Sequence, residues 1–159
     1  MAMSPYLAAV RAKLGPDLLM MPSVCGCVFD DEGRLLMAEH GDVGLWAAPG
    51  GAVDPDERPE DAVRRELREE LDIDVRVRGV IGVYGGPEFR TRYPNGHECA
   101  YMIAMYGCEL VSGTPTPDGD EIRDARWVRE DELAGLRLTP WSPLALPDAY
   151  AWWRAHAAG

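Results

Sequence analysis

The chain has 159 residues, which is enough for one domain with a proper hydrophobic core. Hydrophobic residues make up 47% of the sequence and the formal net charge is −11. This acidity argues against general binding of nucleic acids or anionic membranes, which draws on clustered Lys and Arg. No apolar run approaches membrane-spanning length, and the N-terminal segment lacks a signal-peptide pattern. We therefore expect a cytoplasmic protein.

The first expected element is a helix over residues 4–14. Ser4 suits the N-cap and Pro5 the first helical position, and Gly15 ends the helix. Residues 21–29 are expected to form a strand, followed by a hairpin turn at 30–33 and a return strand at 34–39. A loop at 40–44 and an extended segment at 45–48 then lead to the glycine pair Gly50-Gly51. This pattern predicts a β-rich first third.

A long helix is expected over residues 59–71. Pro59 suits its first position, but Arg58 in the N-cap slot lacks a side-chain oxygen acceptor. Its buried stripe is expected at four-residue spacing, at Val63, Leu67 and Leu71. Glu66 and Glu70 border that stripe, so both acids can reach the seam between helix and sheet.

The rest of the chain predicts strands at 75–84, 98–110 and 122–128, loops at 93–96 and 112–120, and helices at 130–136 and 148–157. Many strands around one strong helix predict an α/β (α+β) layered domain. There is no repeat, low-complexity segment or linker, so residues 1–159 are expected to form a single domain.

The four cysteines do not have the spacing of a zinc site. Cys25 and Cys27 lie two residues apart in an apolar run, and Cys99 and Cys108 have no nearby His pair. They are expected to be buried and reduced.

Acidic residues cluster in Arg65-Glu66-Leu67-Arg68-Glu69-Glu70. On a helix, Glu66 and Glu70 are i,i+4 neighbours and Glu69 lies within one turn of Glu66. Three such carboxylates repel one another unless a cation lies among them. Mg²⁺ prefers oxygen ligands and pairs with phosphate oxygens, so the cluster indicates metal-assisted phosphate chemistry.

The same residues, with Gly51 and Glu57 at fixed spacing before them, resemble the Nudix box. Residues 45–51 and 125–133 resemble the flanks usual in that family, and the resemblance spans about residues 20–137. One position departs from the pattern, because Asp72 replaces the usual glycine. Asp tolerates the left-handed conformation expected at a helix C-terminus better than most residues do, so we expect a modest stability cost.

The resemblance implies an α/β/α sandwich with a mixed central sheet and a metal-dependent hydrolase of pyrophosphate bonds in nucleoside diphosphate derivatives. It implies Glu66 and Glu70 as ligands of Mg²⁺ or Mn²⁺, with Glu69 acting directly or through water and the Gly50 carbonyl as a further oxygen. Gly51 would be structural, and Glu57 and Arg65 would hold the loop and helix in shape. A carboxylate must take the proton of the attacking water, and Glu121 and Glu70 are equal candidates. The expected catalytic set is Glu69, Glu70, Glu121 and Arg65.

Substrate contacts are expected from side chains in or beside loops. Arginine suits phosphate oxygens and aromatic rings suit a stacked base. The candidates are Trp46, Phe89, Arg90, Arg92, Tyr93 and His97. Core or surface duty remains an alternative for each of them.

Several alternatives stay open. The protein could be a nucleotide-binding regulator without catalysis, or an isoprenoid diphosphate isomerase, for which Cys99 beside Glu98 is the available hint. For a hydrolase, ADP-ribose, dinucleoside polyphosphates, nucleoside triphosphates and nucleotide sugars all remain possible substrates. No nucleic-acid or membrane partner is expected. A homodimer could form through the N-terminal segment or the region of Trp152 and Trp153.

Overall fold

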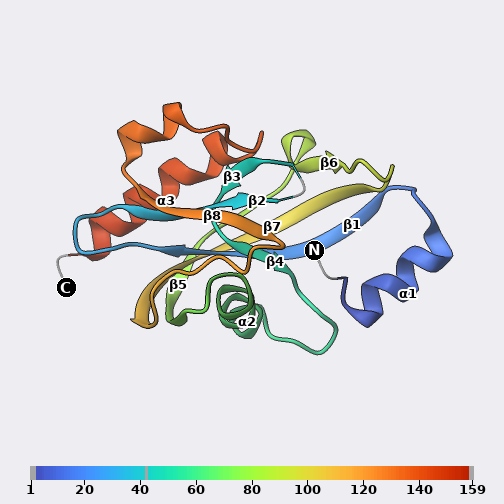
Figure 1. Ribbon diagram of the computed structural model, residues 1–159, viewed down its shortest axis with the longest axis horizontal. Coiled ribbons are helices and arrows are strands. Elements are labelled where there is room, and N and C mark those ends of the chain that lie inside the picture. Colours follow the sequence, from blue (N-terminus) through green and yellow to red (C-terminus); the bar gives the residue numbers. More distant parts are fainter. Residues whose placement is uncertain (1–2, 42, 158–159) are drawn as a thin grey trace.

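Two β-sheets lie between helices in the computed structural model of the protein (Figure 1). The structure describes residues 3–41 and 43–157. In chain order, with η marking a 3₁₀-helix, the elements are α1 (Pro5–Leu14), β1 (Leu19–Val28), β2 (Leu35–His40), β3 (Leu45–Ala47), β4 (Gly50–Ala52), α2 (Pro59–Leu71), β5 (Asp74–Tyr84), η1 (Pro87–Phe89), β6 (Arg90–Arg92), β7 (Glu98–Ser112), β8 (Ile122–Val128), η2 (Glu130–Gly135) and α3 (Ser142–His156).

The larger sheet is mixed. Its strands run in the order β4-β1-β7-β5, and β6 pairs with β7 off this path. Strands β1 and β7 are parallel, whereas the pairs β1–β4, β5–β7 and β6–β7 are antiparallel. The smaller sheet is antiparallel and has the order β3-β2-β8. Figure 1 shows α2 on one side of the sheets and α3 on the other, which confirms the expected α/β/α sandwich.

Helix α2 has the bounds that the sequence predicts, and its stripe is fully buried at Val63, Leu67 and Leu71. The helix approaches β1 most closely at Gly26, where a Cβ would lie 2.5 Å from Cδ1 of Leu67. Each fully buried leucine contributes about 1.5–3 kcal/mol of hydrophobic free energy. The helix therefore packs closely against the sheet through this stripe. The residues that border the stripe, Glu66 and Glu70, lie next to the strands.

The end of α2 is also as expected. Asp72 adopts the left-handed conformation with φ 54° and ψ 40°, and its N–H donates to the carbonyl of Arg68 at 3.1 Å. At the other end, Arg58 makes no side-chain cap. Helix α1 likewise matches its prediction, because Ser4 Oγ accepts the N–H of Leu7 at 3.3 Å.

The expected hairpin over residues 21–39 forms its turn but not its ladder. Asp30 Oδ1 accepts the N–H groups of Glu32 and Arg34, at 3.0 and 2.9 Å. Beyond the turn, the strands are joined only by a bridge between Phe29 and Leu35 among the described residues, and they enter different sheets. One edge of β1 is paired along its length with β7, and the other edge is paired with β4 at residues 23–25.

Two further elements differ from the predictions. The last helix begins at Ser142, six residues before the expected start, and continues through Pro147. Proline usually ends helices, which is why the sequence predicts a start after it. Residues 90–92, for which no element is predicted, form the short strand β6 on β7. No helix in the described part of the chain has the length and apolar character needed to cross a membrane.

Candidate active site

The carboxylates of Glu66 and Glu70 meet the glycine pair at the edge of the larger sheet. Both side chains are buried, with residue exposures of 7% and 2%. The N–H of Gly50 donates to Oε2 of Glu70 at 3.0 Å. Gly51 lies directly against Glu66, where a Cβ would be 2.5 Å from Oε1. The absence of a side chain at Gly51 therefore makes room for the Glu66 carboxylate, whereas at Gly50 a Cβ would collide with the backbone of Val24 and Cys25 on β1.

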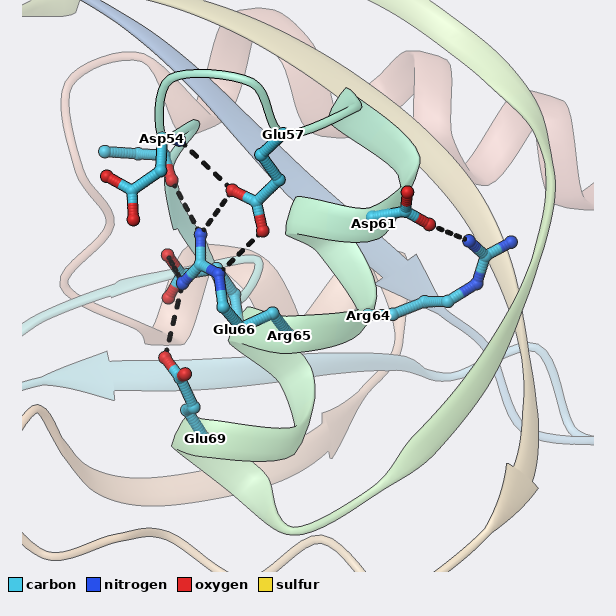
Figure 2. A network of polar contacts seen from close by, with 8 residues as sticks. Asp54, Glu57, Asp61, Arg64, Arg65, Glu66 and Glu69 are labelled. Carbon is cyan, nitrogen blue, oxygen red and sulfur yellow. Dashed lines mark hydrogen bonds and ion pairs between the residues drawn. The ribbon is translucent and has the colours of Figure 1, made fainter. Parts of the chain in front are cut away.

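Arg65 ties this part of α2 to the preceding loop (Figure 2). Its guanidinium donates to both oxygens of Glu57, at 2.8 and 2.9 Å, and to the carbonyl of Ala52 at 3.0 Å. It also donates to Glu66 Oε1 at 2.8 Å and to Glu69 Oε2 at 3.3 Å. The ion pair of Glu57 with Arg65 thus fixes the loop against the helix, which is the role that the resemblance implies for both residues.

The environment of these two carboxylates disfavours their ionised forms. Burial raises the pKa of Glu66, and the hydrogen bond from Arg65 only partly opposes it. Burial, followed by the charges of Glu66 and Glu121, raises the pKa of Glu70 well above its ordinary value, against the Gly50 hydrogen bond. The neighbouring Cys25 thiol also has a raised pKa, through burial first and then through Glu70 and Glu66. A bound cation would relieve this concentration of charge.

The donor set fits a hard divalent cation such as Mg²⁺ or Mn²⁺, which prefers oxygen ligands. Glu66 and Glu70 are the residues that would hold it. Glu69 is placed differently, because its side chain is 61% exposed and is held by Arg65 (Figure 2). Within residues 3–41 and 43–157, no three His, Cys, Asp or Glu side chains already converge as a metal site. The chain thus supplies a buried pair of carboxylates, with Glu69 at the rim.

A loop after β7 brings Glu121 to the same place. The loop is fastened to the last turn of α2, because the N–H of Asp118 donates to the carbonyl of Glu70 at 3.0 Å and that of Thr116 to the carbonyl of Leu71 at 2.8 Å. Asp118 orders the residues that follow, since its carboxylate accepts the N–H groups of Asp120, Glu121 and Ile122. The charge of Glu121 then contributes to the raised pKa values of both Glu66 and Glu70.

Beside the carboxylates lies a cavity of about 350 Å³. Its walls come from both sheets, and the most informative lining residues are Ser23 and Cys25 on β1, Ile103 on β7, Ala47 on β3, and Glu70 and Glu121 at the acidic end. The cavity size falls at the lower end of the range for small-molecule sites, roughly 300–1,000 Å³. The arrangement is therefore a pocket of small-molecule size with acidic residues at one end.

Three of the expected substrate residues line this cavity: Arg90, Arg92 and Tyr93. The two arginines share the carboxylate of Glu98, at 3.4 and 3.6 Å. The hydroxyl of Tyr93 is hydrogen-bonded to that of Tyr101. Both tyrosines therefore form one polar wall near the arginines.

Trp46 lies elsewhere than we expected. Its neighbours Leu45 and Ala47 line the cavity, but Trp46 is buried in the core and its ring packs under the guanidinium of Arg126, 4.9 Å from the ring centroid. Phe89 is also a core residue, stacked on Trp141, and His97 lines a separate small cavity.

The cysteine expected for an isomerase lies apart from the carboxylates. Cys99 lines the small cavity under α1, where it accepts a hydrogen bond from Arg11 at 3.1 Å. The geometry gives no support to the isomerase alternative. Sequence reasoning missed Ser23, Cys25 and Ile103 as lining residues. Their alternation on β1 and β7 is visible in the sequence, but the pairing that turns this face toward the cavity is not a local property.

Comparison with known proteins identifies the family. The family model described as NUDIX domain matches residues 19–149. A MutT-like protein of Streptomyces ambofaciens is 47% identical over 129 residues, covering 81% of this chain and 76% of that protein. A putative 8-oxo-dGTP diphosphatase of Bacillus subtilis is 31% identical over 106 residues, covering 67% of this chain and 64% of that protein. The nucleoside triphosphatase NudI of Escherichia coli is 34% identical over 121 residues, covering 72% and 86%.

Solved structures show the same fold. A MutT NUDIX hydrolase from Burkholderia pseudomallei has a TM-score of 0.68 at 27% identity, covering 82% of this chain and 98% of that chain. An ADP-ribose pyrophosphatase from Streptococcus suis has a TM-score of 0.68 at 24% identity, covering 86% and 93%. With the family model matched over most of its length and its acidic helix packed against a glycine pair, the chain belongs to the Nudix hydrolase family.

Proposed function

We propose that this Nudix pyrophosphohydrolase cleaves nucleoside triphosphates to nucleoside monophosphate and pyrophosphate, with Mg²⁺ or Mn²⁺ as cofactor. The observation that carries the proposal is the buried Glu66–Glu70 pair, of which Glu70 lines a cavity of about 350 Å³, near the lower end of small-molecule sites. Such a cavity suits one nucleoside better than a dinucleotide. The names of the Bacillus subtilis and Escherichia coli relatives point to nucleoside triphosphates as well.

In this proposal the chain has three tasks. Glu66 and Glu70 would hold the cation, which would supply Lewis-acid charge to phosphate oxygens and make an adjacent water more acidic. The pair formed by Glu57 and Arg65 keeps α2 and its loop in register, so that the carboxylates stay aimed at the cavity. Water then attacks phosphorus, the bridging P–O bond breaks, and pyrophosphate leaves with that bond's electron pair.

We propose that Glu121 is the general base that accepts the proton of the attacking water. Glu70 is buried, accepts the Gly50 N–H and would serve as a ligand, so its carboxylate is already committed. Glu121 is only partly buried and lines the cavity from the loop that α2 anchors. A carboxylate at the water-facing edge of the site is the better-placed base.

A substrate panel tests the function. Nucleoside triphosphates, ADP-ribose, diadenosine polyphosphates and nucleotide sugars would each be incubated with Mg²⁺, Mn²⁺ or EDTA, and the products separated by chromatography. We expect metal-dependent release of pyrophosphate from a nucleoside triphosphate. Preferred turnover of ADP-ribose or of a dinucleotide would overturn the substrate class. Nucleotide binding without any turnover would favour the regulator alternative.

A cytoplasmic location and a homodimer remain part of this proposal. The four buried cysteines, described without disulfides, support a reducing compartment. Measurement of molar mass in solution by light scattering tests the dimer.

A further inference from the structure

A serine in the cavity wall has a buried hydroxyl with nothing to bond. Ser23 of β1 is 6% exposed. Among the buried side-chain nitrogen and oxygen atoms of residues 3–41 and 43–157, its Oγ is the one without a hydrogen-bond partner. Buried polar atoms are nearly always paired, because an unpaired one loses its hydration for nothing in return. We therefore expect this hydroxyl to gain a hydrogen-bond partner when a ligand binds.

Ser23 stands on the cavity side of the sheet. Side chains alternate along β1, so Ser23 shares a face with Cys25, which also lines the cavity. Its partner across the parallel ladder is Ile103. Both of these neighbouring side chains, Cys25 and Ile103, are apolar. Rotation about its single side-chain dihedral can move Oγ between staggered positions without displacing the backbone.

The position of Ser23 along β1 can be compared with that of the acidic residues, where the phosphates of a nucleotide would bind. Cys25 pairs with Gly50, whose N–H donates to the carboxylate of Glu70. Ser23 lies two residues along β1 from Cys25, about 7 Å away. A nucleotide whose phosphates lie at the carboxylates would therefore extend its base toward Ser23, where the walls are apolar.

Resting on the proposed function, we propose that Ser23 is a specificity-determining residue that hydrogen-bonds a polar edge of the nucleobase. The base is the planar, weakly polar part of a nucleotide and suits the apolar walls, whereas the sugar stays nearer the charged mouth. A hydroxyl can donate or accept, so it can pair with an amino group or a carbonyl oxygen of the base. The substrate would thus supply the partner that the free protein lacks.

This role predicts an unusual pair of effects for Ser23→Ala. The free protein loses an unpaired polar atom, so its melting temperature should stay the same or rise. The complex loses a hydrogen bond in a buried site, so kcat/KM for the best nucleotide should fall about 10- to 100-fold. A serine with a purely structural role would show the opposite pattern.

Ser142 provides the matched control for stability. It is also fully buried, but its Oγ is hydrogen-bonded to Thr139 Oγ1 at 2.6 Å and reaches the carbonyl of Trp46 at 3.5 Å. Ser142→Ala should therefore lower the melting temperature, because Thr139 loses its partner. The two variants remove the same atom from buried sites and differ in whether that atom was paired.

The deciding experiment measures kcat/KM of wild type and Ser23→Ala on the four common nucleoside triphosphates, their 2′-deoxy forms, and base analogues that lack one exocyclic amino group. We expect the variant to lose selectivity between bases and between each base and its analogue, while the ribo-to-deoxy ratio stays unchanged. Unchanged base selectivity in Ser23→Ala, or a change in the ribo-to-deoxy ratio alone, would overturn the inference. Wild type that cleaves none of these nucleotides would overturn the proposed function as well.

Discussion

The carboxylate of Glu66 rests against the Cα of Gly51, so closely that a Cβ there would lie 2.5 Å from Oε1 and 2.6 Å from Cδ. Glu66 cannot withdraw easily, because Oε1 is also bonded to Arg65 at 2.8 Å. A glycine at position 51 is therefore required by the position of a neighbouring side chain.

Gly51→Ala should displace the Glu66 carboxylate and lower kcat/KM by about 100-fold or more, since a 1 Å misplacement can cost that much. Gly79→Ala is the control, because a Cβ at Gly79 meets nothing within 4 Å. Steady-state kinetics and circular dichroism of both variants check the prediction. Wild-type activity in folded Gly51→Ala would contradict the packing argument.

Glu70→Gln should abolish most turnover and leave the fold intact. The amide keeps an acceptor for the Gly50 N–H but removes the buried charge, so kcat should fall by orders of magnitude. Because the folded pKa of Glu70 is raised, its carboxylate costs stability increasingly as pH rises above the ordinary value of 4.5. In EDTA at pH 8 the variant should therefore melt at the same temperature as wild type or higher. Glu60→Gln, an exposed change on the same helix, should alter neither quantity.

Glu121→Gln tests the assignment of the base. Loss of the proton acceptor should lower kcat about 10²- to 10⁴-fold while KM changes little. Asp120→Asn, next to it on the same loop, is the control for local charge. If Glu121→Gln keeps activity within a factor of three of wild type, the base is Glu70 instead.

Glu57→Gln should destabilise the protein in a pH-dependent way. The hydrogen bond from Arg65 lowers the pKa of Glu57 below 4.5, so the ionised pair stabilises the fold above pH 4.5. That contribution is lost as pH falls from 4.5 through the folded pKa. At pH 7 the variant should lose about 1–2 kcal/mol of unfolding free energy, and the difference should shrink below pH 4.5. A constant difference from pH 3 to 7 in urea titrations would argue against the ion pair.

Arg11→Leu should loosen α1. The guanidinium of Arg11 is buried and donates to the carbonyls of Gly15, Asp17 and Glu98. Its loss leaves those acceptors without their donor, and we expect about 2–4 kcal/mol of destabilisation. Lys13→Ala, exposed on the same helix, should change stability by less than about 0.5 kcal/mol. Proteolysis within residues 3–18 should become faster in Arg11→Leu alone.

Local patterns predict α2 well, because its signals agree. Pro59 marks the start, the four-residue stripe marks the buried face, and Asp72 marks the end in the left-handed conformation. The same stripe places Glu66 and Glu70 toward the strands, so the acidic half of the site follows from the amino-acid sequence alone.

The walls of the cavity cannot be predicted from local patterns in this way. Ser23 and Trp46 both lie on strands, and alternation says only that neighbours face opposite sides. Which side becomes the cavity depends on the parallel pairing of β1 with β7 and on the second sheet, which are set by contacts distant in sequence. The start of α3 is hidden for a different reason, since Pro147 lies inside a helix that packing maintains.

The loop that carries Glu121 is fastened on both sides of the site. The N–H of Asp118 donates to the carbonyl of Glu70 on α2, and the carbonyl of Glu121 accepts the N–H of Gly41, which follows β2 of the smaller sheet. A motion that spreads the two sheets would therefore move Glu121, the proposed base, relative to Glu66 and Glu70. Opening of the cavity and bond cleavage would then be coupled, so a mutation that favours an open form should slow both product formation and substrate capture.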